Sequence, residues 1–143
     1  MPDILQAFPI RATADQVFDA VATPKGLDEW WAVRSSGHPV VGAEYQLSFG
    51  PEHEWKGQVT VCEPGSAFEL EIVKADQDWT GTRVGFRLEP RGRTTWIRFS
   101  HTGWPSANEH YCISVHCWAL YLRILRRWLE HGERVPYDQR LNA

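Results

Sequence analysis

The sequence predicts an α+β fold in which a curved antiparallel β-sheet wraps around one long C-terminal α-helix, with two short helices after the first strand. Three observations carry this prediction. Between residues 44 and 102 apolar residues recur with a period of two, which is typical of strands that bury one face. Two short helical patterns precede this stretch, and one long amphipathic pattern follows it. A sheet with one apolar face needs a cover, which the long helix can supply.

The N-terminal part predicts a strand and two helices. Residues 4–10 alternate as a strand with its apolar side chains on one face. Thr13 and Gln16 have the spacing of a capping box, so we expect a helix to begin directly after Thr13. Thr23 followed by Pro24 opens the second helix, because proline needs no N–H donor at the first helical position. The apolar residues of this second helix share one face: Leu27, Trp30 and Trp31.

The middle of the chain predicts an antiparallel meander that is wetted on one side. Apolar and polar residues alternate within each strand, and turns rich in glycine and proline separate several of them, as at residues 63–66 and 90–92. The five predicted strands cover residues 44–49, 57–62, 68–72, 83–89 and 95–101.

The C-terminal part predicts the longest helix. Ser106 and Glu109 have the spacing of a second capping box, so the helix is expected from Ala107 to Glu130. Gly132 is placed to end it. A helix about 10 Å wide cannot fill the concavity of a six- or seven-stranded sheet. Either large side chains fill the remaining space or a cavity stays open. The apolar stripe of the helix consists of Cys112, Val115, Trp118, Ala119, Leu122, Leu125 and Leu129.

Composition limits the function classes. A chain of 143 residues predicts a single domain over residues 1–143, and 43% apolar with 23% charged residues is typical of a globular protein. The net charge of −3 argues against non-specific nucleic-acid binding. No segment approaches the run of about twenty apolar residues that spans a bilayer, so we expect no membrane association. The start does not resemble a secretory signal, and three cysteines without a CxxC pair fit a cytoplasmic protein.

A set of short motifs runs along nearly the whole chain. They are Pro9-Ile10, residues 14–21, Thr23-Pro24, Leu27, Trp30-Trp31, residues 42–45, Gly57-Gln58-Val59, Glu63-Pro64, residues 101–104, and Trp118 with Leu122, Leu125 and Leu129. Together with the element order, these motifs make the chain similar to the START-like (SRPBCC, Bet v-like) superfamily. Within it the chain resembles the branch named after the C-terminal domain of the activator of heat-shock protein 90 ATPase. One departure is Cys117, because many relatives carry glycine before the helix tryptophan.

The resemblance implies a helix-grip fold and three alternative functions. Superfamily members bind lipids and other apolar ligands, so the first hypothesis is a binder of a small hydrophobic molecule. Some members are cyclases or dehydratases, so the second is an enzyme that uses the same cavity. The namesake stimulates a chaperone ATPase, so the third is an interaction module with a chaperone-like protein partner. The first is preferred, and the ligand and the oligomeric state stay open.

Large side chains at strand and helix spacing are the candidates for lining the space between sheet and helix. The same pattern is also typical of a filled aromatic core. His101 continues the inward face of its strand and could orient a polar ligand group or transfer a proton. The alternative is a neutral histidine with a structural hydrogen bond. The candidate ligand-binding residues are Trp31, Tyr45, Phe49, Phe68, Phe86, Phe99, His101, Trp104, Trp118 and Leu122.

Metal and cofactor chemistry have weak support. Cys112 and His116 have a spacing that can share a metal ion, but a closed site needs two more ligands. His110 and Cys117 point away from that pair on a helical wheel. The chain has no GxSxG, glycine-rich phosphate loop or HExxH motif. We therefore expect no metal site and no cofactor, and an enzyme would depend on His101.

Overall fold

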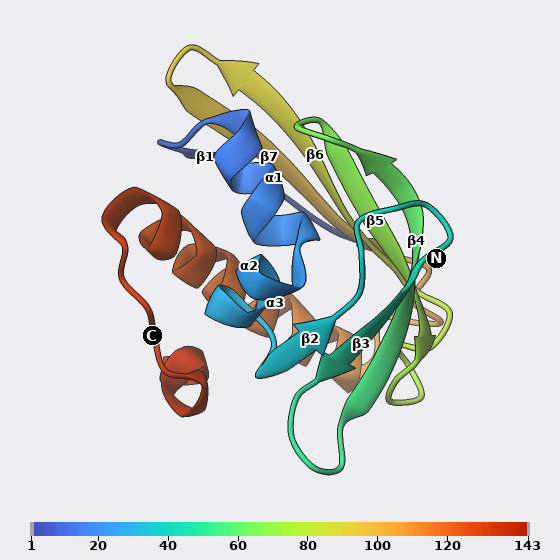
Figure 1. Ribbon diagram of the computed structural model, residues 1–143. Coiled ribbons are helices and arrows are strands. Elements are labelled where there is room, and N and C mark those ends of the chain that lie inside the picture. Colours follow the sequence, from blue (N-terminus) through green and yellow to red (C-terminus); the bar gives the residue numbers. More distant parts are fainter. Residues whose placement is uncertain (1, 143) are drawn as a thin grey trace.

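The computed structural model describes residues 2–142, and its elements follow the predicted order (Figure 1). The elements are β1 (Ile4–Ile10), α1 (Ala14–Ala22), α2 (Pro24–Trp30), β2 (Arg34–Ser36), β3 (Glu44–Ser48), β4 (Glu54–Glu63), β5 (Ala67–Lys74), β6 (Arg83–Arg91), β7 (Thr94–Thr102), α3 (Glu109–His131) and the 3-10 helix η1 (Tyr137–Asn142).

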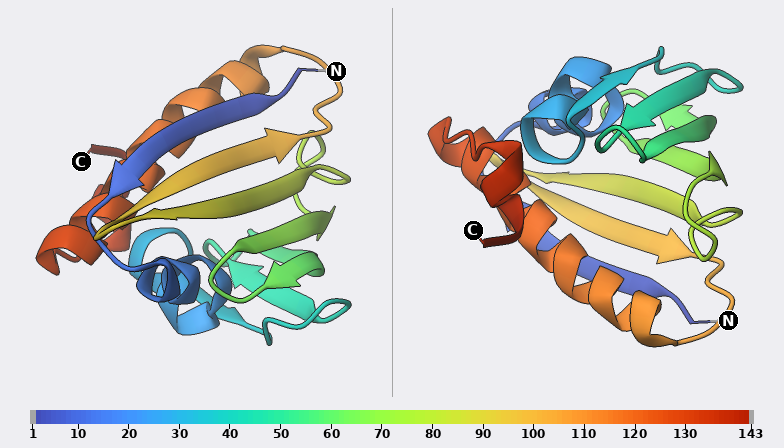
Figure 2. Two further views of the ribbon diagram at one scale, coloured as in Figure 1. Left: turned by 90° about the horizontal axis from the view of Figure 1, so that it is seen from above. Right: turned by 90° about the horizontal axis from the view of Figure 1, so that it is seen from below.

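The seven strands form one antiparallel sheet in the order β1-β7-β6-β5-β4-β3-β2. The sheet curves, and α3 runs along its inner side (Figure 2). Register shifts at Lys56/Gly57 and Val59/Val61 in β4 contribute to the curvature, because a bulge bends its strand. These findings confirm the α+β helix-grip fold, with two short helices between β1 and β2.

The three helices divide the inner face of the sheet. α1 packs over β5 and β6, α2 lies beside β2, and α3 packs against β1 and against α1 and α2. α1 and α2 meet closely at Gly26, where a Cβ atom would collide with the backbone of Asp19 and Ala20. The second helix can therefore cross the first only with glycine at this position.

The N-terminal helix starts are confirmed. The Thr13 hydroxyl accepts a hydrogen bond from the Gln16 amide at 3.2 Å, and the Gln16 side chain accepts one from the Thr13 amide at 3.0 Å. Thr23 caps α2 by accepting from the Gly26 amide at 3.0 Å. The predicted apolar face of α2 is buried, although Trp31 is the capping residue after the helix rather than part of it.

The predicted start of the long helix is wrong. Its N-cap is Asn108, whose side chain accepts a hydrogen bond from the Tyr111 amide at 2.9 Å, and Ser106 is exposed outside the helix. Trp104 gives the physical reason, because its fully buried ring holds the preceding loop against the sheet and delays the helix. The predicted end is confirmed, since Gly132 adopts a left-handed conformation with a φ of 68°.

One strand and the start of another were not predicted. The short edge strand β2 contains only Arg34, Ser35 and Ser36, and it pairs with β3. Its polar sequence has no apolar period that could indicate a strand. β4 begins at Glu54, before the predicted residue 57, and so brings Trp55 into the sheet. Within residues 2–142, no helix combines the length and the apolar character that crossing a lipid bilayer requires.

Candidate functional site

Aromatic rings from most of the elements meet between the sheet and α3. The Trp118 ring of α3 lies 4.5 Å from Phe99 of β7 and 5.3 Å from Trp31, measured between ring centroids. Trp79, from the loop before β6, stacks on Trp118 at 5.7 Å. We call ten of these connected rings the ring cluster: Trp30, Trp31, Phe49, Trp55, Trp79, Phe86, Phe99, His101, Trp104 and Trp118.

The ring cluster contains seven of the ten candidate residues named from the sequence: Trp31, Phe49, Phe86, Phe99, His101, Trp104 and Trp118. Tyr45 and Phe68 lie apart, under α1. The Tyr45 hydroxyl donates to the Ala22 carbonyl, and the Phe68 ring contacts Phe18 of α1 at 6.4 Å. Leu122 is buried on α3 and faces β1.

Four further residues of the site were not among the sequence candidates. One of them, Trp30, was predicted only to lie on the apolar face of the second helix. Trp55 precedes Gly57 and Val59 at a period of two and shares their inward face, so this signal was present in the sequence. Trp79 and Thr82 lie in the irregular segment between β5 and β6, where no periodicity indicates which way a side chain points. Sequence patterns could therefore have identified Trp30 and Trp55 but not Trp79 and Thr82.

His101 is fully buried and forms hydrogen bonds through both ring nitrogens. Its Nδ1 accepts from the Trp118 indole N–H at 3.0 Å, and its Nε2 lies 2.8 Å from the Thr82 hydroxyl. The single Thr82 hydroxyl proton is donated to the Trp79 carbonyl. The Thr82 oxygen must therefore accept from His101, which fixes the histidine as the neutral form with its proton on Nε2.

The surroundings of His101 oppose its protonation. Burial, and secondarily the nearby charge of His110, lower the pKa of His101 from 6.5 to about 3. A proton on Nδ1 would also face the Trp118 N–H, which is itself a donor. His101 is thus a neutral connector between β7, α3 and the loop before β6, and neither ring nitrogen is free to exchange a proton in this arrangement.

Trp104 carries a polar group without a partner. Its indole Nε1 is buried, and within residues 2–142 no hydrogen-bond acceptor lies in range of it. The residue is fully buried, and its ring lies 4.8 Å from His101 and 5.5 Å from Tyr111. Burying an unsatisfied donor costs about 1–3 kcal/mol. The ring cluster therefore includes one N–H group that can satisfy an acceptor from outside the protein.

The rings of the cluster contact one another and fill the space between the sheet and α3. Phe49 and Trp55, at one edge of the cluster, are half-buried, and the other eight members are buried. A groove of about 680 Å³ lies elsewhere, between α1, α2 and the C-terminal end of α3, and no ring-cluster residue lines it. Side chains that line this groove include Asp19, Lys25 and Trp128.

One of the helix residues considered for a metal, His110, has a carboxylate partner. His110 Nδ1 lies 3.0 Å from an oxygen of Asp78, and Asn108 also donates to that oxygen at 3.3 Å. Cys112 is exposed. In the part of the chain that the structure describes, residues 2–142, no three histidine, cysteine, aspartate or glutamate side chains are grouped to hold a metal ion.

The sheet that wraps around α3 and the two helices between β1 and β2 define a helix-grip domain of the START-like class. Within that class the chain belongs to the family of activator of Hsp90 ATPase homolog 1-like proteins, whose model matches residues 11–130. None of the curated proteins matches the chain.

Several solved structures are similar to this chain. The Aha1 dimer from Colwellia psychrerythraea is 27% identical, with a TM-score of 0.83, and the match covers 93% of this chain and 99% of that chain. Protein MLL2253 from Mesorhizobium loti is 19% identical, with a TM-score of 0.78 and coverage of 92% and 99%. CalU16 from Micromonospora echinospora is 19% identical, with a TM-score of 0.74 and coverage of 98% and 84%. The last two establish the fold alone.

Proposed function

We propose that this chain binds a small apolar or aromatic molecule that carries a hydrogen-bond acceptor, between the sheet and α3. The observation that carries the proposal is the buried Trp104 Nε1, which has no acceptor within residues 2–142. It lies among aromatic rings that could contact the apolar body of a ligand on several sides. An acceptor on the ligand, such as a carbonyl oxygen, would then complete the hydrogen bond.

The driving force would be the burial of apolar surface, at roughly 25 cal/mol for each Å² removed from water. Because the rings contact one another, the ligand has to separate some of them. Phe49 and Trp55 are the members to move first, since they are half-buried and contact each other at 4.8 Å. Contacts between ligand and rings would replace the contacts between rings that are lost.

The hydrogen bonds of His101 favour binding over proton transfer. A general acid or base needs a ring nitrogen within reach of the substrate and a pKa near the working pH. Both nitrogens of His101 are engaged with Trp118 and Thr82, and its pKa is lowered to about 3. We therefore propose a binding protein, in which His101 sets the position of Trp118.

The test uses two dyes that differ in one acceptor. Prodan is a dimethylaminonaphthalene that carries a ketone and changes its emission in apolar surroundings, and dimethylaminonaphthalene without the ketone is the matched ligand. We expect the wild-type chain to bind prodan more tightly. Trp104→Phe should remove this difference, because the variant keeps an aromatic ring but loses the N–H donor.

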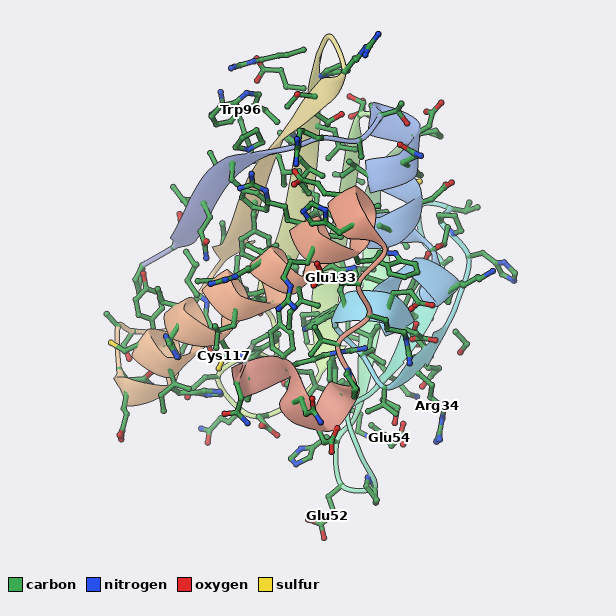
Figure 3. All side chains as sticks on the ribbon, turned by 90° about the vertical axis from the view of Figure 1, so that its left-hand side faces the viewer. Arg34, Glu52, Glu54, Trp96, Cys117 and Glu133 are labelled. Carbon is green, nitrogen blue, oxygen red and sulfur yellow. The ribbon has the colours of Figure 1, made fainter. Side chains whose placement is uncertain are left out.

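Two further variants locate the binding site. Trp118→Ala should weaken prodan binding by about tenfold or more, which corresponds to about 1.4 kcal/mol. The control is Trp96→Ala, because Trp96 lies away from α3 (Figure 3). The centroid of its ring lies 4.8 Å from the guanidinium carbon of Arg91. Equal losses in the two variants, or no binding of either dye by the wild type, would contradict the proposal.

A further inference from the structure

The chain after α3 folds back over one edge of the ring cluster. Residues 133–142, which we call the C-terminal strap, leave the end of α3 and return beside it as η1 (Figure 1). Seen from the side, η1 lies next to α3, toward the hairpin between β3 and β4 that carries Glu52 and Glu54 (Figure 3). The half-buried Phe49 lies against the strap, because its carbonyl accepts a hydrogen bond from the Tyr137 hydroxyl of η1.

Arg140 anchors the strap to α2. Only 1% of its surface is exposed, although it carries a charge. Its guanidinium donates to three main-chain carbonyls: Val135 at 3.1 Å, Ala32 at 3.2 Å and Asp28 at 2.9 Å. Asp28 and Ala32 flank Trp31, a central member of the ring cluster. Arg140 therefore fixes the backbone from which the Trp31 ring enters the site.

Two other strap residues extend the attachment. The Tyr137 hydroxyl donates to the carbonyl of Phe49 at 3.3 Å, and the Tyr137 ring lies 5.4 Å from the Arg140 guanidinium. Arg134 pairs with Glu29 of α2 at 2.8 Å. The strap thus joins α2 to the segment after β3. Trp31 directly follows α2, and Phe49 directly follows β3.

The attachment is mostly polar. Of the strap residues 133–142, Val135 and Arg140 are buried and Tyr137 is half-buried, and the others are exposed. When the strap is released, water can satisfy the three carbonyls and the guanidinium that now bond each other. A short segment in which most residues are exposed and few apolar side chains are buried belongs to the low-stability end of a fold, where local opening is easiest.

We propose that the C-terminal strap is the gate of the ligand site, with Arg140 as its latch. This inference rests on the proposed function. The strap is closed in this structure, and its release opens a route between α3 and the β3–β4 hairpin to Phe49, Trp31 and Trp118. A gate that does not contact the ligand changes the free-energy barriers to association and to dissociation by the same amount. Association and dissociation therefore change together, and the affinity stays nearly constant.

The test measures prodan binding by stopped-flow fluorescence on the full chain. The variants are Arg140→Gln and the milder Tyr137→Phe. The control is Arg126→Gln, which removes the ion pair between Arg126 and Glu130 on α3 at 3.1 Å. We expect Arg140→Gln to raise both rate constants about tenfold, with the dissociation constant changed less than about twofold. Tyr137→Phe should raise both by a smaller factor, and Arg126→Gln should change neither.

The possible failures are distinguishable. Unchanged rate constants in both strap variants, with dye binding intact, overturn the gate and leave the proposed function standing. A change in the dissociation constant alone also overturns it, because Arg140 would then only position Trp31. If the wild type binds no dye, both proposals fail. Amide hydrogen exchange at Gln139, whose N–H donates to the Pro136 carbonyl at 2.9 Å, gives a ligand-free readout. Faster exchange is expected in Arg140→Gln, and unchanged exchange counts against the latch.

Discussion

Two buried tryptophans of the ring cluster use their indole N–H groups in opposite ways. Trp118 donates to His101, and that bond helps to orient the histidine. Trp104 is equally buried and its N–H has no acceptor within residues 2–142. Because the two residues have the same side chain and nearly the same exposure, a comparison between them separates the hydrogen bond from ring packing.

We expect Trp118→Phe to destabilise the ligand-free protein more than Trp104→Phe does. Both substitutions remove a similar volume from a buried site, so their cavity costs are similar. Trp118→Phe also leaves His101 Nδ1 without its hydrogen-bond donor. Trp104→Phe, in contrast, removes an N–H donor that has no acceptor. The difference in the free energy of unfolding, measured by urea denaturation, should be about 1–3 kcal/mol. Equal destabilisation would mean that Trp104 Nε1 has an acceptor.

For single residues, the sequence predicts the direction of a strand side chain but not its hydrogen-bond partners. The inward direction of His101 could be predicted, because it follows Ile97 and Phe99 at a period of two. Its partners could not, because Thr82 and Trp118 come from different elements and meet it only after the fold forms. Trp79 illustrates the same limit, since a loop has no period that gives the direction of a side chain.

The start of α3 depends on competition between two possible caps. Serine and asparagine are comparably good N-cap residues, so the sequence alone does not decide between Ser106 and Asn108. The structure selects Asn108, which also donates to Asp78 at 3.3 Å. Burial of Trp104 two residues before Ser106 accounts for this choice, because it keeps the intervening loop out of the helix.

This choice predicts different effects of two alanine substitutions. Asn108→Ala should lower the free energy of unfolding by about 1 kcal/mol, because the Tyr111 amide loses its acceptor. Ser106→Ala should change it by less than about 0.5 kcal/mol, as is usual for an exposed position. Thermal unfolding followed by circular dichroism measures both. A larger effect at Ser106 would contradict the observed start of α3.

The whole molecule places two aromatic groups on one face of one sheet. The ring cluster lies by α3, whereas Tyr45 and Phe68 lie by α1. A period of two indicates that these residues share the inner face, and that much was predicted correctly. It does not indicate which helix covers which part of that face, because this depends on helix crossing. That crossing depends on contacts such as the one at Gly26, which only the assembled structure reveals.

The connections of His101 predict how the stability of the whole fold depends on pH. The pKa of His101 is lowered to about 3 in the folded protein, against 6.5 for an ordinary histidine. Well above pH 6.5 the ring is neutral in both the folded and the unfolded state, so it contributes no pH dependence. As the pH falls from 6.5 toward 3, the unfolded chain takes up a proton that the folded protein excludes, so the folded state loses stability.

The expected loss is about 2 kcal/mol between about pH 7 and about pH 5, because each pH unit well below the unfolded pKa contributes about 1.4 kcal/mol. Urea denaturation of the wild type and of His101→Gln at both pH values measures it. Other titrating groups are common to both proteins, so they cancel in the comparison. The variant should start less stable at neutral pH and lose about 2 kcal/mol less on acidification. Parallel losses would mean that His101 accepts a proton inside the folded protein, and proton transfer by this residue would regain support.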